Sequence, residues 1–279
     1  MKRFGLIGHP LGHTLSPWIH QQLFSLQGAD AFYDALDIPP EQLPSRRQEL
    51  LTLDGFNVTI PHKQVIIPFL RGLSQRASLY GAVNTVSSDG IGHNTDCLGF
   101  LQALEGGGIA LSGNVAVLGA GGASRVFAME AALAGCSVTI ASRASGMEKA
   151  QALACEAREK VPGAQVFSCD LDELKGPFDV LVNGTPVGMF PHADSCPVKD
   201  NILTRCGAVF DAVYNPTDTM LLQKAKAAGA KTVGGMPMLV WQAAKAQEIW
   251  FHTAFDPRDV DALVPQATEE LMRVFGRSN

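Results

Sequence analysis

The sequence predicts an α/β protein of two domains, because strand and helix patterns alternate along most of its 279 residues. Short apolar runs rich in β-branched residues alternate with segments whose apolar residues recur at helical spacing. The glycine run Gly106–Gly108 interrupts this alternation and is the expected domain junction. We therefore expect one domain from residues 1–105 together with 235–279, and a second from residues 106–234.

The second domain is organised around the stretch from Asn114 to Arg125. Val115–Leu118 has the length and composition of a buried parallel strand, and a glycine turn and a helical pattern follow it. This order leaves backbone N–H groups at the positive end of a helix, where a pyrophosphate binds. Gly119 permits the tight turn, Gly121 permits close approach of a ligand, and Ser124 is small enough for helix–strand packing. A glycine-rich βα turn without a ligand is the alternative.

The next strand ends in Ser142-Arg143, roughly 20 residues after the glycines, where an acid that binds the ribose usually stands. No Asp or Glu is present there, and the nearest is Glu148. A carboxylate would repel a 2′-phosphate, whereas Arg143 can pair with it bidentately. The sequence therefore favours NADP over NAD as the cofactor, and a solvated loop arginine is the alternative.

Composition limits the class of protein. Apolar content of 46% and charged content of 18% are typical of a globular protein with an ample core. The net charge of −5 argues against a nucleic-acid partner, and we expect neither a signal peptide nor a membrane span. The six cysteines, at positions 97, 136, 155, 169, 196 and 206, show no metal-like spacing. They are expected to be reduced core residues of a cytoplasmic protein with no metal site.

The pattern predicts the elements of both domains in order. In the first domain we expect strands at 4–7, 32–36, 56–59 and 82–86, with helices at 40–51, after Pro61, and at 96–104. A further helix starts at Ser16-Pro17, with Ser16 as N-cap, and Asp89-Gly90 is expected to form a hairpin turn. In the second domain strands are expected near 115–118, 137–141, 165–168, 179–183, 208–211 and 231–233. This alternation implies parallel sheets with helices on both faces.

Two helical patterns close the sequence, at 237–252 and 257–275, the second capped at Asp256-Pro257. Because no strand remains for these helices to flank, we expect them to pack on the first domain.

The first domain carries the polar residues that a dehydrogenase substrate would need. Hydride transfer to a nicotinamide requires a side chain that exchanges a proton with the substrate hydroxyl. Polar residues gather at predicted strand ends, where ligands bind in open α/β folds, in the segments 8–17, 57–63, 82–85 and 94–96. Hydroxyls and amides at such positions suit a polyhydroxylated substrate, because each can donate and accept hydrogen bonds.

Lys63 and Asp96 are the ionisable groups most suited to proton transfer. Apolar ring surface and a cationic nicotinamide favour release of the lysine proton, and an opposing carboxylate orients the amine and counters that effect. A surface lysine and an aspartate at a helix N-terminus are the alternative. Four loop histidines, at positions 9, 13, 62 and 93, lack ligand spacing, so hydrogen-bonding roles are expected for them. For Met236 and Met238, methionines at such positions are more often core residues than cofactor contacts.

With these residues in place, the chain resembles the shikimate dehydrogenases along nearly its whole length. In the first domain the matching motifs are G-x-P-x-x-H-[ST]-x-S-P at 8–17, N-V-T-x-P-x-K at 57–63, A-V-N-T at 82–85 and N-T-D at 94–96. Further matches are the glycine turn at 119–122, N-G-T-P-V-G-M at 183–189, Y-N-P at 214–216 and M-L-V-x-Q-A at 238–243. The resemblance implies NADP-dependent, reversible interconversion of 3-dehydroshikimate and shikimate in aromatic amino-acid (chorismate) biosynthesis.

The resemblance also implies roles for individual residues. Lys63 and Asp96 would be the catalytic pair, and Thr14 and Ser16 would bind the substrate carboxylate. The ring hydroxyls and their surroundings would be held by Asn57, Thr59, Asn84, Tyr214 and Gln242. The cofactor would be lined by Gly119, Gly121, Gly122, Ala123, Ser142, Arg143, Thr185, Val213, Gly235 and Met238. The reaction would take place in a cleft between the domains of a monomer or homodimer.

Three departures from the family pattern leave alternatives open. Thr14 stands where Ser is common, Ser142-Arg143-Ala144 replaces Asn-Arg-Thr, and Trp241 replaces a small residue and would reshape the cleft wall. A quinate/shikimate dehydrogenase that uses NAD or both cofactors is therefore an alternative. A non-catalytic NADP-binding regulatory paralogue is another, of a different class. A folate- or tRNA-linked reductase is not supported, because the polar loops at 8–17 and 57–63 suit a small hydroxy acid.

The predicted role of Arg143 can be tested by substitution. Arg143→Ala removes the group that would pair with the 2′-phosphate, so the KM for NADP should rise far more than the KM for NAD. Steady-state kinetics with each cofactor measure both constants. An equal rise in the two would show that Arg143 does not bind this phosphate.

Overall fold

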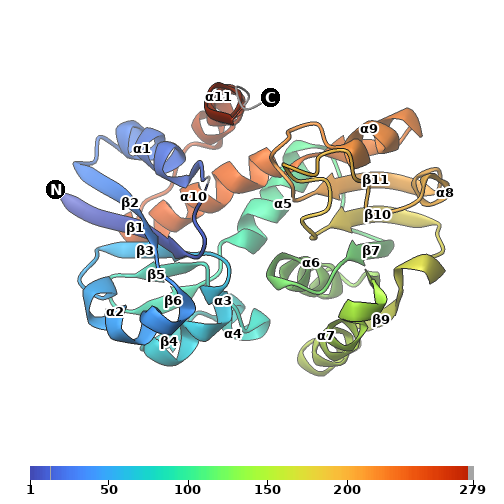
Figure 1. Cartoon of the computed structure of the whole chain (residues 1–279), viewed down its shortest axis with the longest axis horizontal. Coiled ribbons are helices and arrows are strands. Elements are labelled where there is room, and N and C mark those ends of the chain that lie inside the picture. The colour runs from blue at the N-terminus through green and yellow to red at the C-terminus, as the bar shows by residue number, and fades with distance from the viewer. Residues whose placement is uncertain (13, 276–279) are drawn as a thin grey trace. The chain divides into compact units, whose positions relative to one another are not determined.

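The computed structural model describes residues 1–12 and 14–275 and divides the chain into two compact units (Figure 1). Unit 1 comprises Met1–Gly99 and Val240–Asn279, and unit 2 comprises Phe100–Leu239. Both boundaries lie inside helices, α5 (Asp96–Gly106) and α10 (Gly235–Phe251). The expected junction at the glycine run is instead the end of α5, where Gly108 has a φ of 62° and Ile109 N donates to Leu104 O.

Unit 1 contains a six-stranded sheet in the order β2-β1-β3-β5-β6-β4. Its strands are β1 (Lys2–Gly8), β2 (Ala31–Asp37), β3 (Gly55–Val58), β4 (Gly72–Leu73), β5 (Thr85–Ser87) and β6 (Ile91–His93). Its helices are α1 (Ser16–Gln27), α2 (Leu43–Leu50), α3 (His62–Val65), α4 (Gln75–Tyr80) and α11 (Pro257–Phe275), with 3₁₀ turns at Pro40–Gln42 and Ile67–Phe69.

The sheet of unit 1 is mixed, contrary to the expectation of parallel sheets throughout. β1 runs parallel to β2 and β3, whereas β5 is antiparallel to β3 and to β6. The predicted hairpin turn is present: Gly90 has a φ of 79° and its N–H donates to Ser87 O. A two-stranded hairpin reverses the chain without a crossover helix, so alternation of elements alone does not imply parallel pairing.

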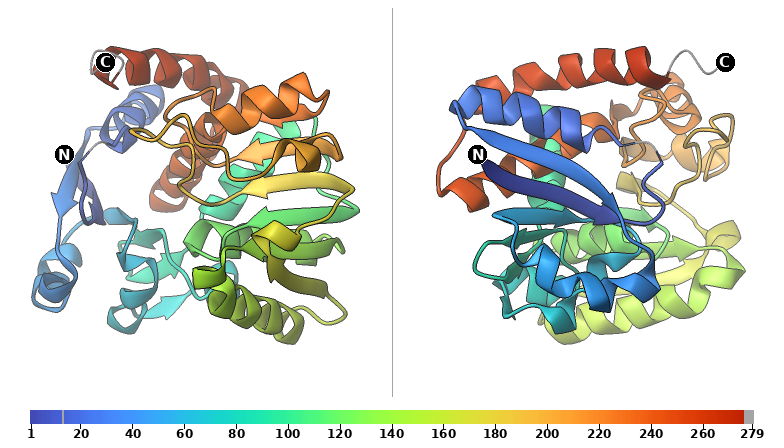
Figure 2. Two further views of the ribbon diagram at one scale, coloured as in Figure 1. Left: turned by 45° about the vertical axis from the view of Figure 1, so that its right-hand side comes forward. Right: turned by 60° about the vertical axis from the view of Figure 1, so that its left-hand side comes forward.

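Opposite faces of β1 pack against different helices. Phe4 and Leu6 lie in a cluster with Phe24 of α1 and Trp250 of α10, and the Phe4 and Trp250 rings stack with centroids 4.6 Å apart. Ile7 belongs to the cluster that contains Leu43 and Leu50 of α2. α11 lies beside α1 (Figure 2). The side-chain alternation of the strand therefore creates two apolar layers, one on each face of the sheet.

Two boundaries in unit 1 differ from the sequence prediction. α1 begins at Ser16 with Leu15 as N-cap, and Ser16 makes no capping contact; its N–H is bound by the Thr14 hydroxyl instead. The strand expected at 82–86 is shorter, because Asn84 takes part in side-chain contacts and β5 begins at Thr85. The predicted cap of α11 is confirmed, since Asp256 Oδ1 accepts from Arg258 N at 2.9 Å.

Unit 2 contains a six-stranded sheet in the order β12-β11-β10-β7-β8-β9, in which every pairing is parallel. Its strands are β7 (Asn114–Leu118), β8 (Ser137–Ser142), β9 (Gln165–Asp170), β10 (Phe178–Asn183), β11 (Cys206–Asp211) and β12 (Lys231–Val233). Its helices are α6 (Gly122–Leu133), α7 (Met147–Lys160), α8 (Asp200–Leu203) and α9 (Met220–Ala227), with 3₁₀ turns at Ala144–Gly146 and Leu171–Glu173. This doubly wound order confirms the predicted Rossmann-type domain.

Helices cover both faces of the unit 2 sheet (Figure 1). Ala116 and Leu118 pack in one cluster with Leu221 and Leu222 of α9. α6 and α7 pack against β7, β8 and β9, and the buried Val115 and Val117 point away from the α9 cluster. No helix among the described residues is long and apolar enough to span a membrane. The expectation that the cysteines are core residues fails for Cys155, which is exposed on α7.

Candidate active site

The structure brings Lys63 and Asp96 together. Lys63 lies on the short helix α3 that follows β3, and Asp96 is the first residue of α5. Lys63 Nζ lies 2.6 Å from Asp96 Oδ2, and the two side chains are 20% and 10% exposed. A contact this close and this sheltered from water is a charge-assisted hydrogen bond with a defined geometry.

The second carboxylate oxygen of Asp96 is also bound. Asp96 Oδ1 accepts from Asn84 Nδ2 at 2.8 Å, and Asp96 N donates to Asn94 Oδ1 at 3.1 Å. The main chain of Lys63 is fixed as well, because its carbonyl accepts from Val83 N at 2.8 Å. Both members of the pair are therefore held in place by their neighbours, and each carboxylate oxygen has a donor.

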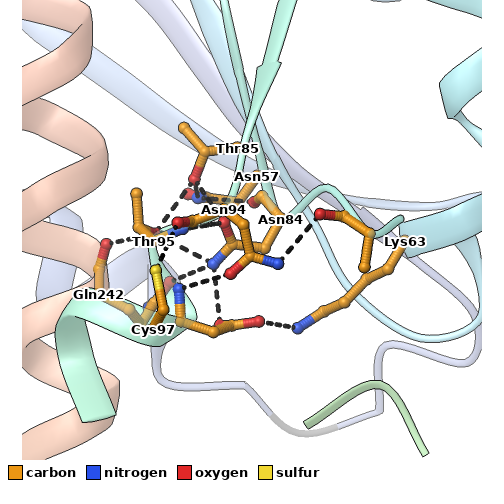
Figure 3. Close-up of polar contacts among 10 residues, drawn as sticks. Asn57, Lys63, Asn84, Thr85, Asn94, Thr95, Cys97 and Gln242 are labelled. Carbon is orange, nitrogen blue, oxygen red and sulfur yellow. Dashed lines mark hydrogen bonds and ion pairs between the residues drawn. The ribbon is translucent and has the colours of Figure 1, made fainter. Parts of the chain in front are cut away.

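A second layer of polar side chains surrounds Asn84. Asn84 Oδ1 accepts from Thr95 N at 2.7 Å, and Asn84 Nδ2 lies 3.0 Å from Thr95 Oγ1. Thr95 Oγ1 donates to the carbonyl of Gln242 at 2.9 Å, and Gln242 Oε1 lies 3.5 Å from Asn84 Nδ2. Gln242, on α10, thus joins residues that are nearly 150 positions away in the sequence (Figure 3).

Asn57 extends the same network. Asn57 Nδ2 donates to Asn84 O at 3.1 Å and to Thr85 Oγ1 at 3.0 Å, while Asn57 Oδ1 accepts from the Tyr33 hydroxyl at 2.8 Å. Asn57, Asn84, Thr85 and Tyr33 are all buried. The predicted residues Lys63, Asp96, Asn57, Asn84 and Gln242 therefore form one polar cluster.

The other predicted substrate residues lie at strand ends and loops. Thr14 Oγ1 donates to Ser16 Oγ at 3.1 Å and accepts from Ser16 N at 3.1 Å, so the two hydroxyls lie together at the start of α1. Thr59 follows β3, and its N–H donates to Ile7 O of β1 at 2.9 Å. Tyr214 belongs to unit 2, and burial raises the pKa of its phenol, which stays a neutral hydroxyl at pH 7.

Trp241 does not line this polar cluster, contrary to the expectation that it reshapes a cleft wall. Its indole Nε1 donates to Asp261 Oδ1 of α11 at 2.9 Å, and its side chain is buried. Its neighbour Gln242 contacts Thr95 instead. Adjacent residues of a helix point about 100° apart. The large indole therefore stabilises the contact between α10 and α11, and Gln242 remains in contact with Thr95.

The loop histidines make hydrogen bonds. His62 Nε2 donates to Ile38 O at 2.6 Å, His9 Nδ1 lies 2.6 Å from Asp37 Oδ1, and His93 Nε2 lies 3.3 Å from Ser87 Oγ. Burial lowers the pKa of His93. His13 lies outside the described residues. Within residues 1–12 and 14–275, no group of three His, Cys, Asp or Glu side chains is placed to hold a metal ion.

The glycine turn of unit 2 connects β7 to α6. Gly119 has a φ of 86°, and a Cβ there would lie 2.7 Å from Thr185 Cγ2, so only glycine fits. A Cβ built on Gly121 meets no atom within 4 Å, so the backbone at the start of α6 faces open space. The first turn of α6 carries no acidic residue. The backbone N–H groups and positive dipole at the start of a helix suit an anionic group.

Four further predicted cofactor residues lie near this turn. Gly122 and Ala123 form the first turn of α6. Ser142 is buried at the end of β8, and the exposed Arg143 follows it. Gly119 N donates to Ala141 O beside them, at 2.8 Å. Ser142 and Arg143 are therefore close to the glycine turn at the end of β8.

Val213, Gly235 and Met238 lie at the other side of the sheet centre. Gly235 N donates to Val213 O at 3.2 Å, and a Cβ on Gly235 would lie 2.3 Å from Ala212 O. Glycine at 235 therefore lets the start of α10 approach the chain after β11. Met238 is buried in the next turn of α10.

Sequence reasoning missed a buried carboxyl that supports this region. Asp211 Oδ1 accepts from Asn183 Nδ2 at 2.9 Å and from Val213 N at 3.0 Å, and Asp211 Oδ2 accepts from Thr219 Oγ1 at 2.6 Å. Burial raises the pKa of Asp211. Asn183 and Asp211 end adjacent parallel strands, which was the available signal, since such ends meet at one edge of a sheet. Tyr33 was missed too, because nothing local marks it, and Thr85 was given no role although it lies in the motif at 82–85.

Comparison with known proteins identifies the family. Residues 6–86 match the family model described as shikimate dehydrogenase substrate binding domain. The NADP(+) shikimate dehydrogenase of Symbiobacterium thermophilum is 41% identical over 260 residues, which cover 88% of this chain and 88% of that protein. The chain belongs to the shikimate dehydrogenase family.

Solved structures of the shikimate dehydrogenase family have the same fold. Shikimate 5-dehydrogenase from Thermus thermophilus, in complex with NADP(H) and shikimate, superposes with a TM-score of 0.86 at 37% identity, covering 96% of this chain and all of that one (100%). Quinate dehydrogenase from Corynebacterium glutamicum, in complex with NAD, superposes with a TM-score of 0.84 at 29% identity, covering 98% of this chain and 99% of that one.

A buried histidine packs against Tyr33, which belongs to the polar cluster. His20 of α1 stacks on Tyr33 with ring centroids 4.1 Å apart, and Gln247 Nε2 lies 3.1 Å from its Nδ1. Burial lowers the pKa of His20 from 6.5 to about 3, against a smaller opposing effect of its hydrogen bond with Asn57. His20 is therefore neutral in the folded protein at pH 5, where an unfolded chain would carry its proton.

This buried histidine should make the protein less stable in mild acid. The unfolded state binds a proton that folded His20 excludes. His20 therefore does not reduce the free energy of unfolding above pH 6.5, and it reduces that free energy progressively as the pH falls from 6.5 toward 3. Between pH 7 and pH 5 the loss attributable to His20 should be about 2 kcal/mol. Urea unfolding of the wild type and of His20→Phe at both pH values measures the free energy of unfolding of each protein. The difference between their two losses is the contribution of His20. Equal losses in the two proteins would contradict it.

Proposed function

We propose that this protein is an NADP-dependent shikimate dehydrogenase in which Lys63 and Asp96 are the catalytic pair. The reaction is the reversible reduction of 3-dehydroshikimate to shikimate. The observation that carries the proposal is the 2.6 Å contact between Lys63 Nζ and Asp96 Oδ2, in a polar cluster of a chain of this family. The relative from Symbiobacterium thermophilum is an NADP(+) shikimate dehydrogenase, which supports both the substrate and the cofactor.

The polar residues of unit 1 suit a hydroxylated carboxylic acid. The adjacent hydroxyls of Thr14 and Ser16 can donate to the substrate carboxylate. The substrate ring hydroxyls would be bound by the amide and hydroxyl groups of Asn57, Thr59, Asn84, Tyr214 and Gln242. Because each of these groups is neutral, the set can exchange donors and acceptors with a polyol without a charge to desolvate.

NADP(H) would be held in unit 2 and would supply or accept the hydride. Its diphosphate would bind at Gly119, Gly121, Gly122 and Ala123, where the start of α6 is open. Ser142 and Arg143 would bind the 2′-phosphate, and the nicotinamide end would lie against Thr185, Val213, Gly235 and Met238.

Lys63 would move the proton that accompanies the hydride. In the reduction, its ammonium group would donate a proton to the reacting oxygen, and in the oxidation the amine would take it back. Asp96 would orient the amine through Oδ2, while Asn84 holds the other oxygen of the carboxylate in place. The pair would thus act as a unit, because Asp96 fixes the position of the amine that transfers the proton.

Removal of the Lys63 amine should lower turnover strongly and leave substrate binding largely intact. Lys63→Ala should lower kcat for shikimate oxidation by about a hundredfold or more, with a KM change of only a few fold, because a general acid acts mainly in the transition state. Lys2→Ala is the matched control, since Lys2 lies over the Phe251 ring in the same unit, outside the cluster. A Lys63→Ala enzyme as fast as the control would refute the assignment.

A quinate dehydrogenase that uses NAD is the second candidate. The solved quinate dehydrogenase with bound NAD supports it, as does the added methyl of Thr14 at the carboxylate end. Assays of shikimate and quinate, each with NADP and with NAD, separate the two candidates. We expect the highest kcat/KM with shikimate and NADP; a higher value with quinate and NAD would favour the second candidate. Tight NADP binding without oxidation of either acid would indicate a regulatory paralogue.

We further propose that the protein acts in the cytoplasm as a monomer or homodimer. All six cysteines are free thiols, which suits a reducing compartment. Sedimentation of the purified protein measures the oligomeric state.

A further inference from the structure

We infer that Thr85 is a positioning residue for the proposed dehydrogenase reaction and fixes the amide orientation of both Asn57 and Asn84. This inference rests on the proposed function. Thr85 is completely buried on β5, directly opposite Asn57 in the antiparallel pair of β5 and β3. Its hydroxyl lies within hydrogen-bond distance of both amides (Figure 3).

Backbone atoms decide which end of each amide is which. The N–H of Thr95 can only donate, so the Asn84 atom 2.7 Å from it is the carbonyl oxygen Oδ1. The main-chain carbonyl of Asn84 can only accept, so the Asn57 atom 3.1 Å from it is Nδ2. These main-chain partners therefore identify the oxygen and the nitrogen of each amide.

The Thr85 hydroxyl links these two amides with a definite direction. It accepts from Asn57 Nδ2 at 3.0 Å, and its own proton points to Asn84 Oδ1 at 3.2 Å. The Thr95 hydroxyl, 3.3 Å away, donates to the Gln242 carbonyl. A hydroxyl is needed at position 85 because only a group that accepts and donates can join an amide N–H to an amide carbonyl.

This link acts on the catalytic pair through Asn84. With Oδ1 held by Thr95 N and the Thr85 hydroxyl, Asn84 Nδ2 faces Asp96 Oδ1 at 2.8 Å. Asp96 in turn holds Lys63 Nζ. Loss of the Thr85 hydroxyl would leave a buried hydrogen of Asn57 without one of its acceptors and loosen Asn84, so Asp96 and Lys63 would be less well oriented.

Substitution of Thr85 tests this role. Thr85→Val keeps the shape and removes the hydroxyl, and we expect kcat for shikimate oxidation to fall about tenfold, since one net hydrogen bond corresponds to about that factor. The KM for NADP should stay within about twofold, because the residues proposed for the cofactor belong to unit 2. Thr85→Ser restores the hydroxyl and should keep kcat within about threefold of the wild type.

A matched control separates positioning from general destabilisation. Thr268→Val removes a hydroxyl bond to Val264 O on α11 of the same unit, outside the cluster, and its kcat should equal that of the wild type. If Thr85→Val does not fold, Thr85→Ala and Thr85→Ser replace it, since the two differ by the hydroxyl alone. A kcat for the Ala variant well below that of the Ser variant supports the inference, and equal values overturn it.

The same measurements separate this inference from the proposed function. A wild type that oxidises no shikimate overturns both. An active wild type with an inactive Lys63→Ala variant, together with Thr85→Val at the wild-type rate, overturns only the role of Thr85. A low kcat for Thr85→Val that Thr85→Ser restores supports it.

Discussion

The contact between Lys63 Nζ and Asp96 Oδ2 is the constraint on which the rest of unit 1 depends. Two charges that are largely sheltered from water remain favourable only where hydrogen bonds satisfy their other polar atoms. Asn84 supplies the donor for the second carboxylate oxygen, and the main chain of Thr95 holds Asn84 in turn. The amide and hydroxyl groups of the cluster therefore follow from the requirement to bury one ion pair in a fixed geometry.

The network also explains why so many elements meet at this point. β3 supplies Asn57, β5 supplies Thr85, the start of α5 supplies Asp96, and α10 supplies Gln242. Each contributes at most a few polar atoms, and contacts such as Asn57 to Thr85 and Thr95 to Gln242 join segments that are distant in the sequence. A cluster assembled in this way is rigid because movement of one element breaks hydrogen bonds to several others.

The glycine turn of unit 2 is built from fewer elements than the polar cluster of unit 1. An anion needs N–H groups and a positive helix end, and one strand, one glycine turn and one helix provide both. Gly119 is required by its positive φ and by the approach of Thr185, whereas Gly121 leaves space for a ligand. The buried carboxyl of Asp211, held by Asn183 and Thr219, fixes the chain after β11 in the same region.

The sequence by itself determined the doubly wound fold of unit 2, the glycine turn and the motifs that contain Lys63 and Asp96. These features are local: apolar periodicity, a glycine spacing and short polar motifs are visible within a few residues. The sequence did not determine the mixed sheet of unit 1, because alternation of elements cannot tell a hairpin from a crossover. The direction of the Trp241 indole, the unit boundaries inside α5 and α10, and the roles of Tyr33, Thr85 and Asp211 were decided only by the tertiary structure. Those features depend on which groups meet across distant segments once the apolar faces are buried, and no local pattern records that.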